Sequence, residues 1–290
     1  MSKLTDFLAG EKILVADGAT GTQLLKAGLK AGVAPESWNL ANPEAIRALH
    51  RGYIEAGANV VLTNTFGGSR FRLGRHGLEG QVKEINEAAA RLAREVAGEA
   101  VFVFGDIGPS GELLKPLGKL PYEEAVAGLA EQAEGLLAGG VDAILIETMS
   151  DINEAKAAVE GVRKVNAEIP ILVTFSFDTH GRTMMGAKPD KVAKEIWALG
   201  VTAMGANCGR TLTETLTAIE QMRAAVPEAV LMAKPNAGLP HATVGDTVYD
   251  VTPEIMAEYA HKFAEQKVKI FGGCCGSAPE HIRAIAEALK

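Results

Sequence analysis

The chain has 290 residues and a mass of 30.4 kDa, with 29 Lys and Arg against 36 Asp and Glu, for a formal net charge of −7. This acidic balance disfavours a general nucleic-acid or anionic-membrane surface, and 47% hydrophobic with 22% charged residues is typical of a globular protein, not a disordered one. No apolar stretch reaches the roughly 20 residues that cross a bilayer. With no signal-peptide pattern at the start and an odd number of cysteines, we expect a cytoplasmic protein.

Short apolar runs alternate with longer helical patterns along the whole chain. These runs are continuous and do not alternate apolar with polar residues, which is typical of strands covered on both faces. We predict strands at Ile13–Asp17, Asn59–Phe66, Val101–Ile107, Ala143–Thr148, Ile171–Phe177, Ala203–Cys208, Val230–Pro235 and Lys269–Gly273.

Helical spacing fills the segments between these runs, often with proline at the first helical position. Eight strands with intervening helices predict an α/β protein, a single (β/α)8 TIM barrel over residues 1–290. An open doubly wound sheet is the alternative, but the turn DGATGTQL lacks the G-x-G-x-x-G spacing of dinucleotide-binding folds. We expect excursions at the barrel mouth in Lys26–Asn42 and Gly67–Gly80. The predicted helices are Pro43–Ala56 (with Asn42 as N-cap), Tyr122–Ala138, Ile152–Val165, Pro189–Leu199, Leu212–Ala225, Pro253–Glu265 and Pro279–Leu289.

All three cysteines fall at the ends of predicted strands. Cys208 follows the sixth strand in GANCG, and Cys274 and Cys275 follow the eighth strand in GGCCG. Because the carboxyl ends of barrel strands meet at one face, three thiolates there would suit Zn²⁺ with one open position, as in a catalytic zinc site. Redox or nucleophilic thiol chemistry, and inert packing of small buried side chains, are the alternatives.

An open zinc position would be most useful for ionising an incoming thiol. A free thiol, with a pKa of about 8.5, is mostly protonated at neutral pH, whereas a metal-bound thiol is deprotonated. Three thiolates make zinc a poor Lewis acid for generating hydroxide, so alkylation of a thiolate is the better fit. Two other classes stay open: a Schiff-base enzyme using Lys234, and a non-catalytic zinc- or thiol-binding protein.

A series of motifs in a fixed order adds to this interpretation. They are DGATGTQL (Asp17–Leu24), NTFGG (Asn64–Gly68), GDIGPSGELL (Gly105–Leu114), ETMSD (Glu147–Asp151), GANCG (Gly205–Gly209), KPNAGLP (Lys234–Pro240) and GGCCG (Gly272–Gly276). Together they resemble the homocysteine S-methyltransferase family over almost the full length of the chain. That family includes the homocysteine-binding module of cobalamin-dependent methionine synthase, betaine–homocysteine methyltransferases and S-methylmethionine-dependent enzymes.

The resemblance implies a methyltransferase of methionine biosynthesis with a catalytic zinc. Its metal ligands and catalytic residues would be Cys208, Cys274 and Cys275. The homocysteine thiolate would take the fourth zinc position and attack an activated methyl group in line, giving methionine. In the cobalamin-dependent relatives a side chain of the PNAG segment, here Asn236, can hold that position without substrate.

The resemblance also implies how the amino-acid end of homocysteine is bound. Asp17 and Glu147 would contact the substrate ammonium group, which is chemically sensible because two carboxylates favour a cation in a partly desolvated site. The backbone N–H groups of Gly18, Ala19 and Thr20 would hold the substrate carboxylate, as glycine-rich turns do for anions.

The methyl donor is expected to be a methylcorrinoid. It would be carried by a separate protein, because the barrel accounts for the whole chain. Betaine, a quaternary ammonium compound, is usually held by aromatic faces, and Gly67 stands where the vertebrate-type betaine enzymes carry tyrosine. In contrast, SFDTHGRTMMG at Ser176–Gly186 resembles stand-alone bacterial members labelled as betaine enzymes, so betaine or S-methylmethionine is the alternative donor. After Cys208 the chain reads GRTLTETL where many relatives have a Gly-Pro turn.

Overall fold

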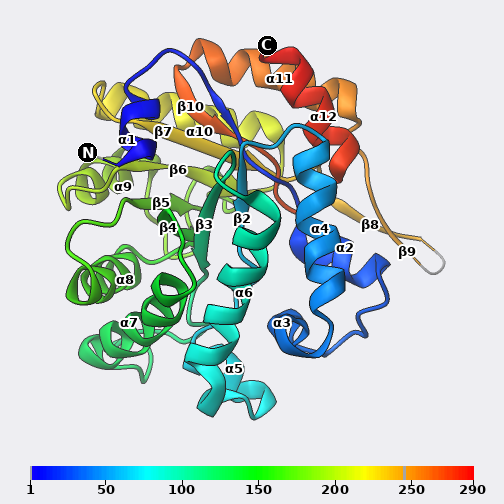
Figure 1. Ribbon diagram of the computed structural model, residues 1–290. Helices are drawn as coiled ribbons and strands as arrows, with labels where there is room; N and C mark the ends of the chain where they lie inside the picture. Colours follow the sequence, from blue (N-terminus) through cyan, green and yellow to red (C-terminus); the bar gives the residue numbers. More distant parts are fainter. Residues whose placement is uncertain (1, 244–245) are drawn as a thin grey trace.

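Eight parallel strands form a barrel at the centre of the computed structural model, which describes residues 2–243 and 246–290 (Figure 1). Around the sheet the order is β1-β10-β7-β6-β5-β4-β3-β2, and a parallel bridge between Ala16 and Val60 joins its two edges. The predicted (β/α)8 barrel is therefore confirmed. The strands are β1 (Leu14–Val15), β2 (Val60–Leu62), β3 (Phe102–Ile107), β4 (Ala143–Met149), β5 (Ile171–Phe175), β6 (Ala203–Cys208), β7 (Leu231–Pro235) and β10 (Val268–Phe271).

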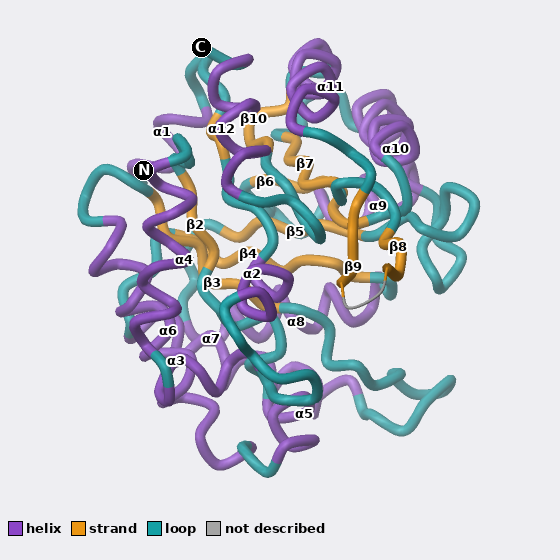
Figure 2. The backbone as a smooth tube through the Cα atoms, turned by 90° about the vertical axis from the view of Figure 1, so that its right-hand side faces the viewer, coloured by secondary structure: helices purple, strands orange, loops and turns teal. Residues whose placement is uncertain are grey.

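Helices connect the strands and surround the barrel (Figures 1 and 2). The sequence analysis assigned no helix between the second and third strands, where α6 is found, although buried Ile85, Ala89 and Leu92 recur there at helical spacing. Asn42 directly precedes α4 as predicted, but its side chain makes no capping hydrogen bond. The outer helices are α4 (Pro43–Glu55), α6 (Val82–Ala97), α7 (Tyr122–Ala138), α8 (Ile152–Val165), α9 (Pro189–Trp197), α10 (Leu212–Ala225), α11 (Pro253–Glu265) and α12 (Pro279–Ala288).

The inside of the barrel is filled by apolar side chains, including those of Leu62, Phe104 and Leu145. The short helix α1 (Lys3–Leu8) adds Leu4 and Leu8 to the same cluster. Phe7 of α1 packs edge-on against Phe102 at the start of β3, with ring centroids 6.3 Å apart. Helix α1 therefore closes the amino-terminal end of the barrel, and the opposite end is left for chemistry.

Several short elements lie at the carboxyl ends of the strands, and the two predicted excursions contain most of them. The β8–β9 hairpin between β7 and α11 was not predicted. In Figure 1 this hairpin and α2 lie on the same side of the barrel, the side that faces the viewer in Figure 2. These elements are α2 (Thr20–Lys26), η1 (Pro35–Ser37), α3 (Trp38–Ala41), α5 (Arg70–Leu73), η2 (Gly74–His76), η3 (Glu79–Gln81), β8 (Pro240–Thr243) and β9 (Asp246–Tyr249).

Across the described ranges, 2–243 and 246–290, no helix is long and apolar enough to cross a membrane.

Candidate active site

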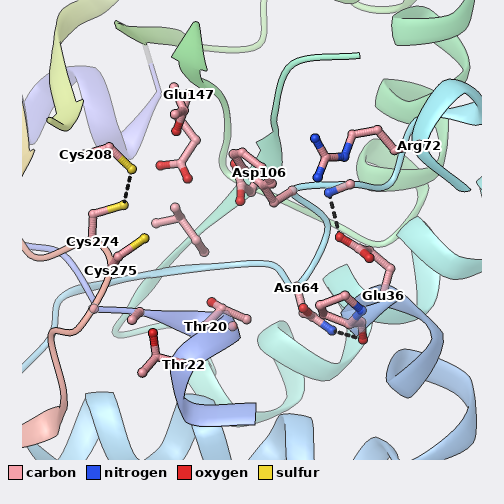
Figure 3. Close-up of a pocket in the computed structure, with 18 of the residues that line it drawn as sticks. Thr20, Thr22, Glu36, Asn64, Arg72, Asp106, Glu147, Cys208, Cys274 and Cys275 are labelled. Carbon is pink, nitrogen blue, oxygen red and sulfur yellow. Dashed lines mark hydrogen bonds between the residues drawn. The ribbon is translucent and has the colours of Figure 1, made fainter. Parts of the chain in front are cut away.

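A cavity of about 370 Å³ opens where the carboxyl ends of the strands meet (Figure 3). Its lining comes from most sides of the barrel: the turn after β1, the segment after β2, the ends of β3, β4, β6 and β7, and the loop after β10. The polar side chains that line it are Thr20, Thr22, Glu36, Asn64, Arg72, Arg75, His76, Asp106, Glu147, Thr148, Cys208, Lys234, Cys274 and Cys275.

The three cysteines meet on one wall of this cavity. The Sγ atoms of Cys208 and Cys274 are 3.0 Å apart, and all three sulfurs lie within 4.8 Å of one another. With Zn–S bonds of about 2.3 Å in a tetrahedral site, sulfur ligands of one ion lie roughly 3.8 Å apart, so small side-chain shifts would let the triad hold a single zinc ion. In the described part of the chain this is the one group of three His, Cys, Asp or Glu side chains so placed.

Hydrogen bonds among the three sulfurs give the three thiols different pKa values. The thiols of Cys208 and Cys274 donate to Cys275 and lower its pKa to about 3. The pKa of Cys208 is raised well above its ordinary value, because its neighbours and its burial favour the protonated thiol. The triad without metal therefore holds one negative charge among three sulfurs, whereas a zinc ion would convert all three to thiolates.

Asn207, next to Cys208, ties the cysteine wall to the end of β4. Its Oδ1 accepts hydrogen bonds from the Thr148 N–H at 2.8 Å and the Thr174 hydroxyl at 2.7 Å. Its Nδ2 donates to Thr148 Oγ1 at 2.7 Å. Thr148 and Cys208 both have left-handed backbones, with φ of 61° and 56°, which cost of order 1–3 kcal/mol each. No role was assigned to Asn207 from the sequence, although it lies inside the GANCG motif.

Asn236 links the two loops that carry the cysteines. Its Nδ2 donates to the Gly209 carbonyl oxygen at 2.7 Å, and its Oδ1 accepts the Cys275 N–H at 3.0 Å. The oxygen that was expected to reach the metal in the absence of substrate therefore has a backbone partner already. In this arrangement Asn236 holds the loop of Cys275 against the loop of Cys208.

Both oxygens of Asp17 have a partner within the protein. Oδ1 lies 3.0 Å from the Lys234 ammonium, and Oδ2 accepts the Leu62 N–H at 2.8 Å. Asp17 and Lys234 are almost completely buried, so each is the counter-charge of the other. Each Asp17 oxygen thus has one partner within the protein and keeps a further lone pair, so contact with a substrate ammonium stays a prediction, and Lys234 serves as an ion-pair partner.

Two other carboxylates beside the cysteines have free oxygens. Asp106 and Glu147 are 5% and 7% exposed, and Asp106 Oδ1 and Glu147 Oε2 have no hydrogen-bond partner among the described residues. Burial raises the pKa of Glu147 to about 8, and burial together with Glu147 raises the pKa of Asp106 well above its ordinary value. A cation between them would relieve this cost. No role was assigned to Asp106 from the sequence, although it lies in the GDIGPSGELL motif.

The turn after β1 packs tightly against the loop after β10. The Ala19 N–H donates to the Ser277 carbonyl oxygen at 2.9 Å and is therefore not available to a substrate. The N–H groups of Gly18 and Thr20 have no partner in the ranges 2–243 and 246–290. A Cβ at Gly18 would lie 2.6 Å from the Ser277 oxygen and 3.0 Å from Tyr53 Oη, which explains the glycine.

The opposite side of the cavity carries Arg72 and Glu36 (Figure 3), and Phe66 also lines the cavity. The Arg72 guanidinium lies 5.3 Å from the centre of the Phe66 ring. Glu36 accepts the Gly67 N–H at 2.6 Å. A cation therefore covers the Phe66 ring, which follows β2 at the cavity wall.

The unusual GRTLTETL segment leaves the cysteine wall intact. Gly209 has a φ of 76°, which favours glycine. Thr211 then caps α10, because its hydroxyl accepts the Glu214 N–H at 3.1 Å. A side-chain cap here starts the helix that follows Cys208.

A (β/α)8 barrel whose strand ends bring three cysteines and two unpaired carboxylates to one cavity defines a barrel enzyme with a thiol-rich polar site. Residues 14–289 match the family model described as homocysteine S-methyltransferase. The chain belongs to this family of methyltransferases.

Curated relatives include methionine synthase of Mycobacterium leprae (strain TN), 34% identical over 308 residues. Methionine synthase of Mycobacterium tuberculosis (strain ATCC 25618 / H37Rv) is 34% identical over 305 residues. The matches cover 98% and 99% of this chain but 25% of each relative, so the chain spans about a quarter of their length. The fold is similar to the homocysteine methyltransferase MmuM from Escherichia coli in its metallated form, with a TM-score of 0.82, 24% identity, and coverage of 98% of this chain and 99% of that one.

Proposed function

We propose that the chain methylates the sulfur of homocysteine to give methionine, using one Zn²⁺ held by Cys208, Cys274 and Cys275. The observation that carries this proposal is the meeting of three sulfurs within 4.8 Å of one another beside two unpaired buried carboxylates. Zinc bound there would supply one thing, a substrate thiol held as its thiolate at neutral pH. A sulfur–carbon bond forms, the bond between methyl and carrier breaks with its electron pair kept by the carrier, and the thiol proton goes to solvent.

The chain's own residues would bind and orient the amino-acid end of homocysteine. We assign its ammonium group to the free oxygens of Glu147 and Asp106, because these two oxygens have no partner within the described residues, whereas each Asp17 oxygen has one. The free N–H groups of Gly18 and Thr20 are assigned to its carboxylate. Anchoring both charged groups leaves the sulfur end directed at the cysteine wall, which supplies the orientation that methyl transfer needs.

For the methyl donor we propose a methylcorrinoid carried by a separate protein. The Arg72 guanidinium covers the Phe66 ring, which argues against a quaternary ammonium group resting on that ring. The similarity to methionine synthases supports the same donor class.

The test is metal analysis of the reduced protein together with zinc-edge X-ray absorption. We expect one zinc ion per chain with three sulfur ligands, and a fourth sulfur ligand when homocysteine is added but not when homoserine, its oxygen analogue, is added. Cys208→Ser should reduce the zinc content. The proposal would be contradicted if the number of sulfur ligands at zinc did not change when homocysteine is added.

A donor screen then measures methionine formed from methylcobalamin, betaine and S-methylmethionine. If methionine forms with betaine or S-methylmethionine but not with methylcobalamin, the corrinoid assignment is wrong, whereas the proposed methylation of homocysteine is supported.

A further inference from the structure

Basic side chains gather on the side of the cavity opposite the cysteines. Arg72 of α5 and Arg75 and His76 of η2 all line it, and Figure 3 shows Arg72 across the cavity from Cys274. The proposed homocysteine site uses none of these three side chains. They therefore need a separate explanation.

Arg72 differs from its neighbours in having no acidic partner. Arg70, on the same helix, donates from Nε to Glu131 at 2.7 Å, and Arg75 lies 2.9 Å from Glu112. The Arg72 guanidinium makes no hydrogen bond or ion pair within the described parts of the chain. A half-buried guanidinium with unused donors at a cavity wall is suited to an oxyanion, which it can bind through two parallel hydrogen bonds.

The surroundings hold Arg72 in place before any ligand arrives. Its guanidinium rests on the Phe66 ring. A Cβ at Gly67 would lie 2.7 Å from Glu36 Oε1 and 3.3 Å from Arg72 Nε, so the glycine leaves room for both side chains. A tyrosine at this position would occupy that space. An aromatic side chain at this wall would favour binding of a cationic ligand group, whereas the Arg72 guanidinium favours an anionic one.

The nearby carboxylate of Glu36 does not neutralise Arg72 by direct pairing. Its Oε1 accepts the Gly67 N–H at 2.6 Å. Burial raises the pKa of Glu36, while the nearby charges of Arg72 and His76 act to lower it. Because Glu36 makes no ion pair with Arg72, the hydrogen-bond donors of the Arg72 guanidinium remain available to a ligand.

We propose that Arg72 binds an anionic group of the methyl donor, a carboxylate or a phosphate, and so fixes the donor across the cavity from the cysteines. This inference rests on the proposed function, because it assigns the second substrate of the same site. A carboxylate would come from a small onium donor and a phosphate from the nucleotide tail of a corrinoid. Both are oxyanions, and an arginine fork recognises either one.

The chain provides a matched pair of variants for the test. Arg72→Met removes the cavity arginine, and Arg70→Met removes an arginine of the same short helix that pairs with Glu131 outside the cavity. Arg72→Lys keeps the charge without the fork and serves if Arg72→Met folds poorly. Inorganic phosphate is the first probe, titrated calorimetrically without homocysteine or donor. We expect at least about a tenfold loss of phosphate affinity in Arg72→Met, an intermediate loss in Arg72→Lys and no change in Arg70→Met.

Methyl transfer then identifies the source of the anion. Methylcobalamin is compared with methylcobinamide, which lacks the nucleotide phosphate, and betaine with tetramethylammonium, which lacks the carboxylate. If the donor is a corrinoid, we expect Arg72→Met to raise the KM for methylcobalamin about tenfold and to leave the KM for methylcobinamide unchanged. If the donor is betaine, the KM for betaine should rise about tenfold and the KM for tetramethylammonium should not change. The homocysteine Kd should be unchanged in either case.

Equal phosphate affinity in Arg72→Met and Arg70→Met would overturn the inference. So would a rise in the homocysteine Kd in Arg72→Met, because Arg72 would then bind the carboxylate of homocysteine. Phosphate binding that needs Arg72 in a protein that forms no methionine with any donor would overturn the proposed function, while the anion site itself would stand.

Discussion

The Lys234 ammonium lies 3.0 Å from Oδ1 of Asp17, with both side chains almost completely removed from solvent. This ion pair stands close to two further buried carboxylates, Asp106 and Glu147, whose charges act on Lys234 and favour its charged form. One cation thus faces three acidic groups. The ammonium group of an amino-acid substrate would supply a second positive charge, so the charge balance of the site favours a cationic ligand.

Lys234→Met should destabilise the protein strongly. The substitution leaves the buried charge of Asp17 without its partner, and breaking such a pair costs about 3–5 kcal/mol. Lys3→Met is the control, because Lys3 and Glu99 pair at the surface with side chains 74% and 90% exposed. Urea unfolding measures both, and adding Asp17→Asn to Lys234→Met should recover part of the loss. Equal stability of the two single variants would contradict a charged buried pair.

Glu147→Gln and Asp106→Asn should each weaken homocysteine binding about tenfold or more, because each removes a charged acceptor for the ammonium group. Binding of 4-mercaptobutyrate, which lacks the ammonium group, should stay the same. Calorimetry on the zinc-loaded protein compares the two ligands. Parallel losses for both ligands would mean that these carboxylates act on the sulfur end.

Asn207→Ala should loosen the cysteine wall. It removes the hydrogen bonds that hold Thr148 next to Cys208, two residues with left-handed backbones. We expect a loss of about 1–3 kcal/mol in unfolding free energy and weaker zinc binding in competition with a chelator. Asn153→Ala, an exposed change in α8, is the control. Unchanged zinc affinity in Asn207→Ala would show that the cysteine loops hold their geometry without it.

His50 should make the free energy of unfolding depend on pH. Burial lowers its pKa to about 4 from 6.5, and neither ring nitrogen has a partner among the described residues. Between these values the unfolded chain binds a proton that the folded protein excludes. The stabilisation is therefore fully present above pH 6.5 and falls by about 3 kcal/mol as the pH drops to 4.

His50→Leu should flatten this part of the pH profile, whereas His261→Leu, an exposed histidine of α11, should leave it unchanged. Urea unfolding of the chelator-treated protein from pH 4 to 8 checks the difference and removes any contribution from metal ligands. Parallel profiles for the wild type and His50→Leu would contradict a neutral buried His50.

Strand and helix positions were largely predictable, because each barrel strand is a continuous apolar run and each helix keeps one apolar face. β6 and the helices α7, α8, α10 and α11 agree with their predicted bounds to the residue. α6 and the β8–β9 hairpin were missed. The helix was overlooked despite its periodicity, and the hairpin lies in a polar segment without a strong alternating pattern.

The site was predictable in its residue types but not in its pairings. Motif positions at strand ends were enough to bring Cys208 and Cys274 together, because every parallel strand of a barrel ends at the same face. The same reasoning could not show that Asp17 forms an ion pair with Lys234, some 200 residues away along the chain. It also could not show that the Ala19 N–H donates a hydrogen bond to the Ser277 carbonyl oxygen.

The sequence by itself therefore determined the barrel, the cysteine triad and the family, since these follow from local patterns and motif order. Only the tertiary structure decided which polar groups have partners within the protein: Asp17 pairs with Lys234, whereas one oxygen each of Asp106 and Glu147 has no partner among the described residues. The physical reason is that a buried charge or hydrogen-bonding group takes whichever partner the fold brings within reach. That competition is settled by three-dimensional proximity and not by distance along the chain.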